Sequence, residues 1–381
     1  MITIGMDVHV RNSYLHVTDE AGNVLRHGRC RNATMDLAKF LGPLEQDARQ
    51  RGEPIRVVLE STTNSRAIQR LLTQYGEAAG IDLTAEVLDA RKIRIIAESV
   101  CKCDRLDAKV LCELARSNLK LPTCYMPDDE EFALREHLRA RNDLVRMRTM
   151  LKNRVHAVLH RRGILAPVAT LFTKTGRAYL AQLSLETAGR EILDRFLAMM
   201  DEIDRTITTS TASMRELMRR PRWAKPAALL QTMPGIGLIT AMTILAELGN
   251  LDRFRSRAAV ANYAGLVPIC RSSNDKRYSG GITHRGSKHL RAALGEAAWS
   301  AMPRVPAYRA MFERIAQKKN KLVAITAVAR RMLEDSFTML RRDEAFRYVG
   351  LSVADTPQQV GTVTPAPTPS SDRKVASSVA G

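Results

Sequence analysis

The sequence has little of what marks a membrane-spanning or a disulfide-stabilised protein. It contains no apolar run of about 18 residues, so no transmembrane helix is expected. The N-terminus reads as a short strand that carries Asp7, which is not the pattern of a signal peptide. Only six cysteines occur in 381 residues, and in a large unsecreted chain they predict reduced thiols. Cys101 and Cys103 have the wrong spacing for a zinc site, and no paired histidines complete one. We therefore expect a cytoplasmic protein that binds no membrane.

Aromatic and acidic residues are also scarce. Aromatics make up 5% of the chain, although 45% hydrophobic residues, with 16 methionines among them, are ample for real cores. Only 40 acids face 59 lysines and arginines, which gives a net charge of +19. Such an excess predicts a polyanionic partner, by default nucleic acid, against the plainer alternative of a merely soluble basic protein. No Walker-type loop is present, so we expect chemistry that needs no ATP.

The first part of the chain reads as a mixed α/β sheet. Three short runs at hairpin spacing predict antiparallel strands, and a helix then alternates with further strands. The expected strands cover Ile2–His9, Tyr14–Thr18, Val24–Arg29, Ile55–Glu60 and Leu83–Leu88, with a helix over Ser65–Tyr75. This order describes a ribonuclease-H-like domain.

Four carboxylates fall at telling places in that domain. Asp7 lies inside an apolar strand, where an unpaired carboxylate would cost several kcal/mol or take up a proton. Glu60 ends another strand, and Asp104 and Asp107, three residues apart, open a helix and share one face of it. Together they suit one or two Mg²⁺ ions with room left for phosphate oxygens. Singly, Asp104 or Asp107 would more often be a helix cap, and Glu60 an ordinary strand end.

The middle of the chain predicts two long helices, from about residue 130 to 160 and from 185 to 218. Seven lysines and arginines against one acid between Arg141 and Arg162 give the first helix a basic face, which includes Arg146 and Lys152. Such a pair forms a long helical hairpin, suited to coiled-coil dimerisation or to clamping RNA. A basic face that is merely solvated is the alternative.

Pro-Gly-Ile-Gly, with Gly235 and Gly237, then joins two predicted helices in the manner of a helix-hairpin-helix motif. Glycines there let backbone N–H groups approach a phosphate without a Cβ in the way. A plain turn between helices explains the same residues about as well.

The stretch Arg271–Arg291 combines hydroxyls, glycines and cations. It has six lysines and arginines and one acid, and no periodicity, so we expect a loop followed by a helix from about Ser287. Its expected nucleic-acid contacts are Arg271, Lys276, Arg277, Arg285, Lys288 and Arg291. A serine in this loop is a candidate nucleophile toward DNA, although a loop serine is more often a turn former.

Ile-Gly-Met-Asp7, Val-Leu-Glu60-Ser and Cys-Asp104-Arg-Leu-Asp107 resemble the Asp-Glu-Asp-Asp signature of the DEDD transposases. The stretch from Gly265-Leu-Val-Pro to Ser273, followed by Gly-Gly-Ile and Arg-Gly, is similar to the C-terminal domain of that family. The family includes the pilin-gene invertase and the insertion-sequence recombinases guided by a bridge RNA. The present sequence departs by having Asn274 where many members have glycine, and Ser272 adjoins the matching serine.

The resemblance implies a RuvC-like domain in which Asp7, Glu60, Asp104 and Asp107 hold Mg²⁺ (or Mn²⁺). It implies Ser273 as the nucleophile, in preference to Ser272, and a phosphoserine link to DNA. It further implies donor and target DNA, a noncoding bridge RNA, and a composite site built in a dimer or in a tetramer made of two dimers. The host would be bacterial, and the protein would associate with the nucleoid when acting.

The expected domains are 1–122 (RuvC-like), 128–222 (helical hairpin) and 226–348 (mostly α-helical transposase domain), with a disordered tail over 352–381. Two other functions are also compatible with these residues. One is a metal-dependent nuclease for Holliday-like junctions, in which water attacks and Ser273 only contacts DNA. The other is a non-catalytic RNA-binding protein on a dead nuclease fold, which the presence of all four acids disfavours.

Overall fold

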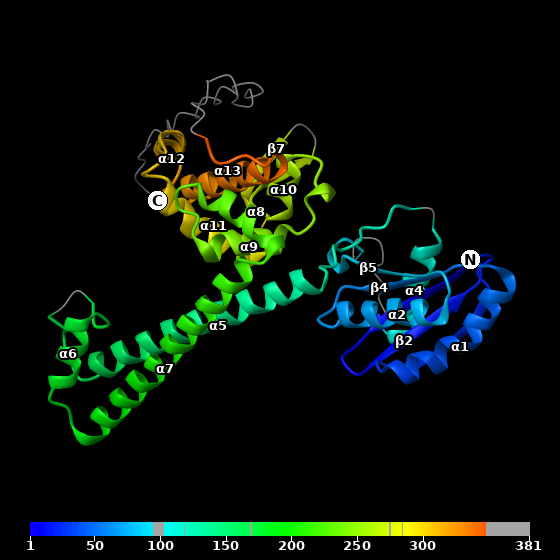
Figure 1. Ribbon diagram of the computed structural model, residues 1–381, viewed down its shortest axis with the longest axis horizontal. Helices are drawn as coiled ribbons and strands as arrows, with labels where there is room; N and C mark the ends of the chain where they lie inside the picture. The colour runs from blue at the N-terminus through cyan, green and yellow to red at the C-terminus, as the bar shows by residue number, and fades with distance from the viewer. Residues whose placement is uncertain (94–102, 118, 168–169, 274–275, 284, 348–381) are drawn as a thin grey trace, which may run out of the picture. The chain divides into compact units, whose positions relative to one another are not determined.

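The computed structural model describes residues 1–93, 103–117, 119–167, 170–273, 276–283 and 285–347, and the predicted tail over 352–381 lies outside them. The chain folds as two compact units, Met1–Asp129 and Glu130–Gly381. The first is a mixed α/β unit and the second is mostly helical (Figure 1). None of the helices in the described ranges combines the length and the apolar composition that a membrane-spanning segment needs.

The first unit is built on one five-stranded sheet with the strand order β3-β2-β1-β4-β5. β1 pairs antiparallel with β2, and β2 with β3, whereas β4 lies parallel to β1, and β5 parallel to β4. The expected mixed sheet is therefore confirmed, and its order of elements is consistent with a ribonuclease-H-like domain. Its elements are β1 (Ile2–Val8), β2 (Asn12–Thr18), β3 (Val24–Arg31), α1 (Thr34–Arg51), β4 (Ile55–Glu60), α2 (Ser65–Ala79), β5 (Leu83–Leu88), α3 (Ala90–Ile93) and α4 (Asp104–Arg116).

Alternation along β1 assigns the two faces of this sheet. Ile2, Ile4, Met6 and Val8 are buried in one core together with residues of α1 and α2. The intervening residues face α4, whose backbone comes so close that a Cβ on Gly5 would lie 2.0 Å from the carbonyl oxygen of Ala108. Because side chains alternate with a period of two, Asp7 shares the α4 face with Gly5.

The second unit begins with two long helices that run side by side in opposite directions. Arg148 of α5 pairs with Asp204 of α7 at 3.1 Å, and Arg141 donates to the hydroxyl of Thr211 at 3.0 Å. A small separate core, which includes Val155, Leu180 and Leu193, closes the far end of the pair near α6 (Figure 1). The bounds are α5 (Asp129–His160), α6 (Lys174–Gln182) and α7 (Thr187–Met218). The coiled-coil description and the domain boundaries drawn from the sequence stay predictions.

The rest of the second unit packs around one large core. Trp223, Tyr308 and Phe337 belong to it, along with buried aliphatic and methionine side chains. The elements are α8 (Pro221–Gln231), α9 (Leu238–Leu248), a 3₁₀ turn η1 (Leu251–Arg253), α10 (Arg257–Tyr263), β6 (Pro268–Ser273), β7 (Lys276–Ile282), α11 (Lys288–Ala301), α12 (Pro306–Lys318) and α13 (Lys321–Arg342). α11 begins as expected, because Ser287 caps it by accepting a hydrogen bond from the backbone N–H of Leu290 at 3.1 Å.

The expectation of a loop between Arg271 and Ser287 was wrong over most of its length. β6 and β7 form an antiparallel hairpin, in which Arg271 pairs with Tyr278 and Ser273 with Lys276. Polar, charged and glycine residues make up most of both strands, so no apolar alternation marked them. The ladder of backbone hydrogen bonds and the short connection fix such a pairing without that pattern.

Candidate metal centre and nucleic-acid-binding elements

Two of the four candidate acids lie at the ends of adjacent parallel strands. The register of β1 and β4 runs through Met6 opposite Leu59, and Asp7 and Glu60 follow directly. Val58, two residues before Glu60, packs in the core formed with α4. Glu60 therefore belongs to the same face of the sheet as Asp7, although Asp7 is buried and Glu60 is only half-buried.

The other two acids occupy the first turn of α4, which covers that face. The close approach of α4 to Gly5 brings the start of the helix toward the end of β1. The helix N-terminus favours negative charge, so this turn can carry both Asp104 and Asp107 at little cost. The side chain of the N-cap residue Cys103 makes no capping bond to this helix.

The structure adds His9, which the sequence reasoning missed. Its Nε2 lies 3.3 Å from Oδ2 of Asp7 and 3.4 Å from Oδ1 of Asp104. Ligand atoms of these three residues lie within 4.8 Å of one another. Glu60 and Asp107 are outside this tight group. The only sign of His9 in the sequence was its place two residues after Asp7, a spacing that returns a side chain to the same face of a strand.

The surroundings of Asp7 disfavour its ionised form. Burial raises its pKa, the charge of His9 opposes that rise, and the carboxylates of Asp107 and Asp104 add to it. For Asp104, partial desolvation acts to raise the pKa, but the hydrogen bond and charge of His9 and the charge of Arg29 hold it below its usual value. Clustered carboxylates that depend on nearby cations in this way are typical of a metal site.

A hollow of about 450 Å³ opens beside these acids. Its wall is the turn between β1 and β2, completed by Arg29 and Asp104. Arg29 pairs with Asp104 at 3.1 Å, while 73% of its side chain stays exposed. The hollow thus has a cation and a carboxylate that could hold a metal ion on one surface, which is an arrangement that suits a phosphodiester.

The candidate nucleophile lies in the second unit. Ser273 is the last residue of β6 and pairs with Lys276, so it stands at the tip of the hairpin, next to Ser272. Arg271 is on β6, and Lys276 and Arg277 are on β7. The four acids thus belong to the first unit and Ser273 to the second.

Three other predicted nucleic-acid contacts follow the hairpin. Arg285 and Lys288 are exposed, and Lys288 opens α11. Arg291 is half-buried, and its Nη1 donates to the carbonyl of Ala264 at 2.9 Å, which gives it a structural task inside the unit. Burial lowers the pKa of Arg291 from its usual value.

The two candidate glycines differ in their surroundings. Gly235 has a φ of +88°, and a Cβ there would lie 2.5 Å from the carbonyl oxygen of Ala297, so packing against α11 already requires glycine. Gly237 caps α9, and no atom lies within 4 Å of the Cβ it lacks. The open approach at Gly237 suits a phosphate better than the crowded one at Gly235.

The basic face of α5 is partly engaged with its own unit. Arg146 is exposed and pairs with Asp143 at 3.4 Å. Lys152 lies over the ring of Phe172, 5.0 Å from its centroid. An exposed ion pair contributes little to stability, so Arg146 remains accessible to phosphates, whereas Lys152 is half-buried.

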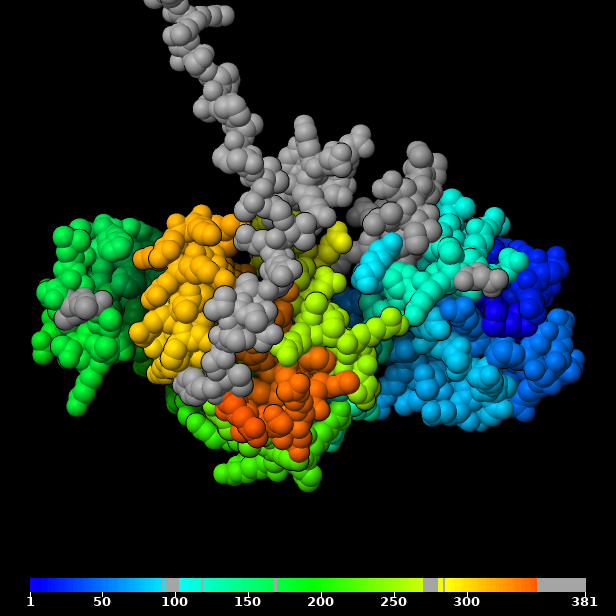
Figure 2. Space-filling view, turned by 90° about the horizontal axis from the view of Figure 1, so that it is seen from above, coloured from blue at the N-terminus to red at the C-terminus, as the bar shows by residue number. Residues whose placement is uncertain are grey.

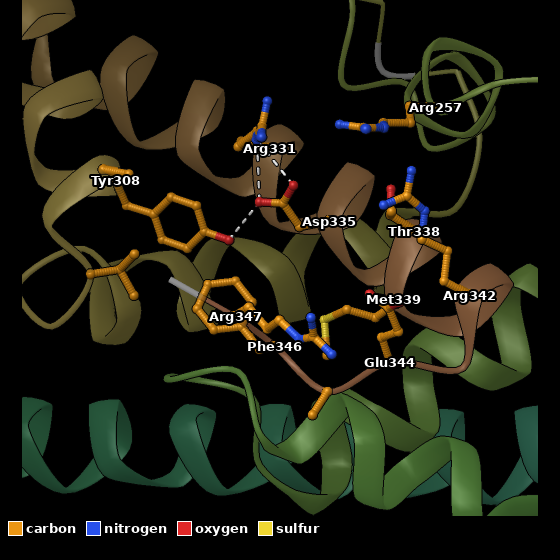
Figure 3. A pocket seen from close by; sticks show the side chains of 13 residues that line it. Arg257, Tyr308, Arg331, Asp335, Thr338, Met339, Arg342, Glu344, Phe346 and Arg347 are labelled. Carbon is orange, nitrogen blue, oxygen red and sulfur yellow. Dashed lines mark hydrogen bonds and ion pairs between the residues drawn. The ribbon is translucent and has the colours of Figure 1, made fainter. Parts of the chain in front are cut away.

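The second unit also contains a cavity of about 330 Å³ between α12 and α13 (Figure 3). The hydroxyl of Tyr308 donates to Asp335 at 2.9 Å, and Arg331 pairs with the same carboxylate at 3.0 Å. Arg257 and Arg342 line the same cavity and are exposed. In Figure 2, the outer surface of α12 and the end of α13 are visible on the same face of this unit. Burial raises the pKa of Tyr308, so its hydroxyl keeps the donated proton.

Comparison with known proteins decides the family. Residues 4–162 match the DEDD transposase family of the IS110 type, and residues 227–313 match the family described as Transposase IS116/IS110/IS902. The chain belongs to the DEDD transposase family. Together the two matches cover well over half of its 381 residues and take in Asp7, Glu60, Asp104, Asp107 and Ser273.

Individual relatives carry related names. The transposase for insertion sequence element IS1328 of Yersinia enterocolitica is 27% identical over 79% of this chain and 84% of the relative. The pilin gene-inverting protein of Moraxella bovis is 35% identical over 32% of this chain and 38% of the relative. The transposase for insertion sequence element IS1111A of Coxiella burnetii is 24% identical over 58% of this chain and 60% of the relative. For y4qE of Sinorhizobium fredii, the chain spans about half of the relative, 48%.

Proposed function

We propose that this DEDD transposase cuts and rejoins DNA at specific sites, through a phosphoserine intermediate formed on Ser273. The observation that carries the proposal is the convergence of Asp7 and Asp104 beside a hollow of about 450 Å³, in a chain whose residues 227–313 match the serine-containing transposase domain. Asp7, Glu60, Asp104 and Asp107 would hold Mg²⁺ or Mn²⁺. Their oxygens fit a hard divalent ion, because Asp7 is buried and surrounded by like charges that a bound cation would offset.

The chemistry divides between the two units. The serine Oγ attacks the scissile phosphorus, the Oγ–P bond forms and the bond to the 3′ oxygen breaks, and the hydroxyl proton of the serine ends on the departing 3′ oxygen. A bound divalent ion would supply charge stabilisation at the phosphate. The hairpin cations Arg271, Lys276 and Arg277 would balance the charge that develops in the transition state. The phosphoserine link conserves bond energy, so the strand can be rejoined without ATP.

The two halves of the site would meet across protomers of a dimer or a dimer of dimers. Two inactive chains test this directly, one with Ser273→Ala and one with Asp7→Asn. Each still has one intact half, so mixed oligomers regain cleavage if the halves come from different protomers. Mixtures that stay as inactive as either variant alone would rule out the shared site, while wild-type activity would still support the chemistry.

A noncoding bridge RNA would select donor and target by base pairing. The net charge of +19 and the exposed cations of α5 support a polyanionic partner of this kind. Sequencing the RNA that co-purifies with the protein tests it. The proposal expects one dominant RNA that matches both DNA partners, and random cellular RNA would speak against it.

A metal-dependent junction nuclease is the second candidate. One observation favours it: the tight group of Asp7, His9 and Asp104 lies wholly within the first unit, and water could serve as nucleophile there. The products separate the two functions. Hydrolysis leaves nicked DNA that is never rejoined and survives Ser273→Ala, whereas recombination yields joined products and does not.

A further inference from the structure

His9 has a geometry that a surface histidine does not need. Its Nε2 faces the carboxylates of Asp7 and Asp104 together, at 3.3 and 3.4 Å. A charge-assisted hydrogen bond to a carboxylate is shorter, at about 2.7–2.9 Å. Both contacts of Nε2 are longer than that, so His9 makes weak hydrogen bonds to two carboxylates at once, and ligand atoms of the three side chains lie within 4.8 Å of one another.

The spacings match those of ligands around one ion. With ligand distances of about 2.1 Å, neighbouring ligands of an octahedral ion lie about 3.0 Å apart and opposite ones about 4.2 Å apart. The two contacts of Nε2 are close to the first value, and the whole group stays within 4.8 Å. Shifts of a few tenths of an ångström would bring both contacts of Nε2 to the spacing of neighbouring ligands.

The backbone of His9 is held in place by three hydrogen bonds. Its carbonyl accepts from Nδ2 of Asn32 at 2.6 Å and from Nδ2 of Asn64 at 2.8 Å, and its N–H donates to the carbonyl of Asn12 at 3.1 Å. Asn32 follows β3 and Asn64 precedes α2, so three segments converge on one residue of a turn. The imidazole itself is 56% exposed, so packing does not explain this support.

We propose that His9 is a nitrogen ligand of the metal centre and makes the centre prefer Mn²⁺ to Mg²⁺. The inference rests on the metal centre of the proposed function and adds the identity of one ligand and of the ion. Mg²⁺ takes oxygen ligands and loses its waters reluctantly, whereas imidazole suits the transition metals. As a neutral ligand beside the four acids, the imidazole of His9 adds no further negative charge around Asp7.

The test is pulsed EPR of the full chain loaded with Mn²⁺ alone. Coupling of the Mn²⁺ electron spin to a directly bound imidazole nitrogen identifies a histidine ligand. We expect this coupling in the wild type, its loss in His9→Ala, and its retention in His27→Ala. His27 is a matched control, because it is an exposed histidine of the same unit that contacts Tyr14 and lies outside the group.

Selectivity gives a second readout. Displacing Mn²⁺ from the wild type should need about tenfold more Mg²⁺ than displacing it from His9→Asp, which replaces nitrogen by oxygen. Circular dichroism of His9→Ala and His9→Asp confirms that both variants fold, since the side chain is exposed.

The outcomes separate this inference from the function beneath it. If the wild type binds Mn²⁺ without nitrogen coupling, or if His9→Ala keeps the coupling, His9 is not a ligand and the acidic metal centre stands. If the wild type binds no Mn²⁺ at all, and Asp7→Asn behaves identically, the metal centre itself fails, and with it the inference.

Discussion

Replacing Gly5 with alanine probes how closely α4 must approach β1 for the site to work. An added Cβ would lie 2.0 Å from the carbonyl oxygen of Ala108 and 2.4 Å from the backbone nitrogen of Cys112. Both neighbours are backbone, so no side chain can rotate away. Ordinary contact begins near 3.4 Å, so α4 must move out by about 1.4 Å.

That movement would carry Asp104 and Asp107 with it, because they form the first turn of α4. A displacement of about 1 Å in a catalytic constellation can cost about 10²-fold in rate. We therefore expect Gly5→Ala to lower the rate of DNA cleavage by about 10²-fold and to weaken Mn²⁺ binding. Overpacking should also destabilise the first unit by about 1–3 kcal/mol.

The assay is cleavage rate under single-turnover conditions, with Mn²⁺ affinity and a denaturant melt on the same samples. Gly42→Ala is the matched control. It lies in α1, no atom is within 4 Å of the Cβ it lacks, and alanine favours a helix, so activity should be unchanged. If Gly5→Ala keeps wild-type cleavage and Mn²⁺ affinity in a folded protein, the position of α4 does not govern the site.

Three further predictions concern stability and binding. Burial raises the pKa of Asp7, so the ionised carboxylate destabilises the metal-free fold at neutral pH. Asp7→Asn should raise the melting temperature at pH 7–8 without metal, and this gain should shrink as the pH falls toward the ordinary carboxyl pKa of about 3.8. Added Mn²⁺ should stabilise only the wild type. A difference in melting temperature that stays the same across this pH range would contradict the assignment. Tyr308→Phe removes the hydrogen bond to Asp335 and should cost about 1–3 kcal/mol in urea denaturation, with loss of less than about 0.5 kcal/mol counting against that bond. Lys288→Ala should weaken nucleic-acid binding and reduce the slope of log affinity against log salt concentration by about 1. The variant should not destabilise α11, because a cation is unfavourable at a helix N-terminus. An unaltered slope would show that Lys288 does not contact the nucleic acid.

Much of the first unit could be predicted from the sequence, because its strands are apolar and its turns are marked. Asp7 stood out for a physical reason: aspartate is disfavoured inside a strand, so its presence signals a task. We predicted that Asp7 and Glu60 act together because each lies near the end of a strand. We predicted the same of Asp104 and Asp107 because residues three apart share one face of a helix. The fold confirms where these elements lie, and it shows that alternation puts Asp7 and Glu60 on the face covered by α4.

The features that escaped prediction lack an apolar signature. The β6–β7 hairpin is polar along most of its length, and α6 and α12 are short helices with few buried residues. His9 is an exposed residue in a turn, and only the meeting of β1 and α4 brings its imidazole beside Asp7 and Asp104. Contacts made between segments about 95 residues apart have no local pattern from which they could be inferred.

The most direct test of the central claim is to find the covalent bond between protein and DNA. Reactions with labelled DNA are stopped by denaturation, digested with trypsin and analysed by mass spectrometry. Cleavage after Arg271 and Lys276 releases one short peptide that contains Ser272 and Ser273. The proposal predicts a nucleotide phosphate on Ser273 of that peptide, absent in Ser273→Ala and in Asp7→Asn. Recombined DNA that forms normally with Ser273→Ala, and without any adduct on this peptide, would contradict it.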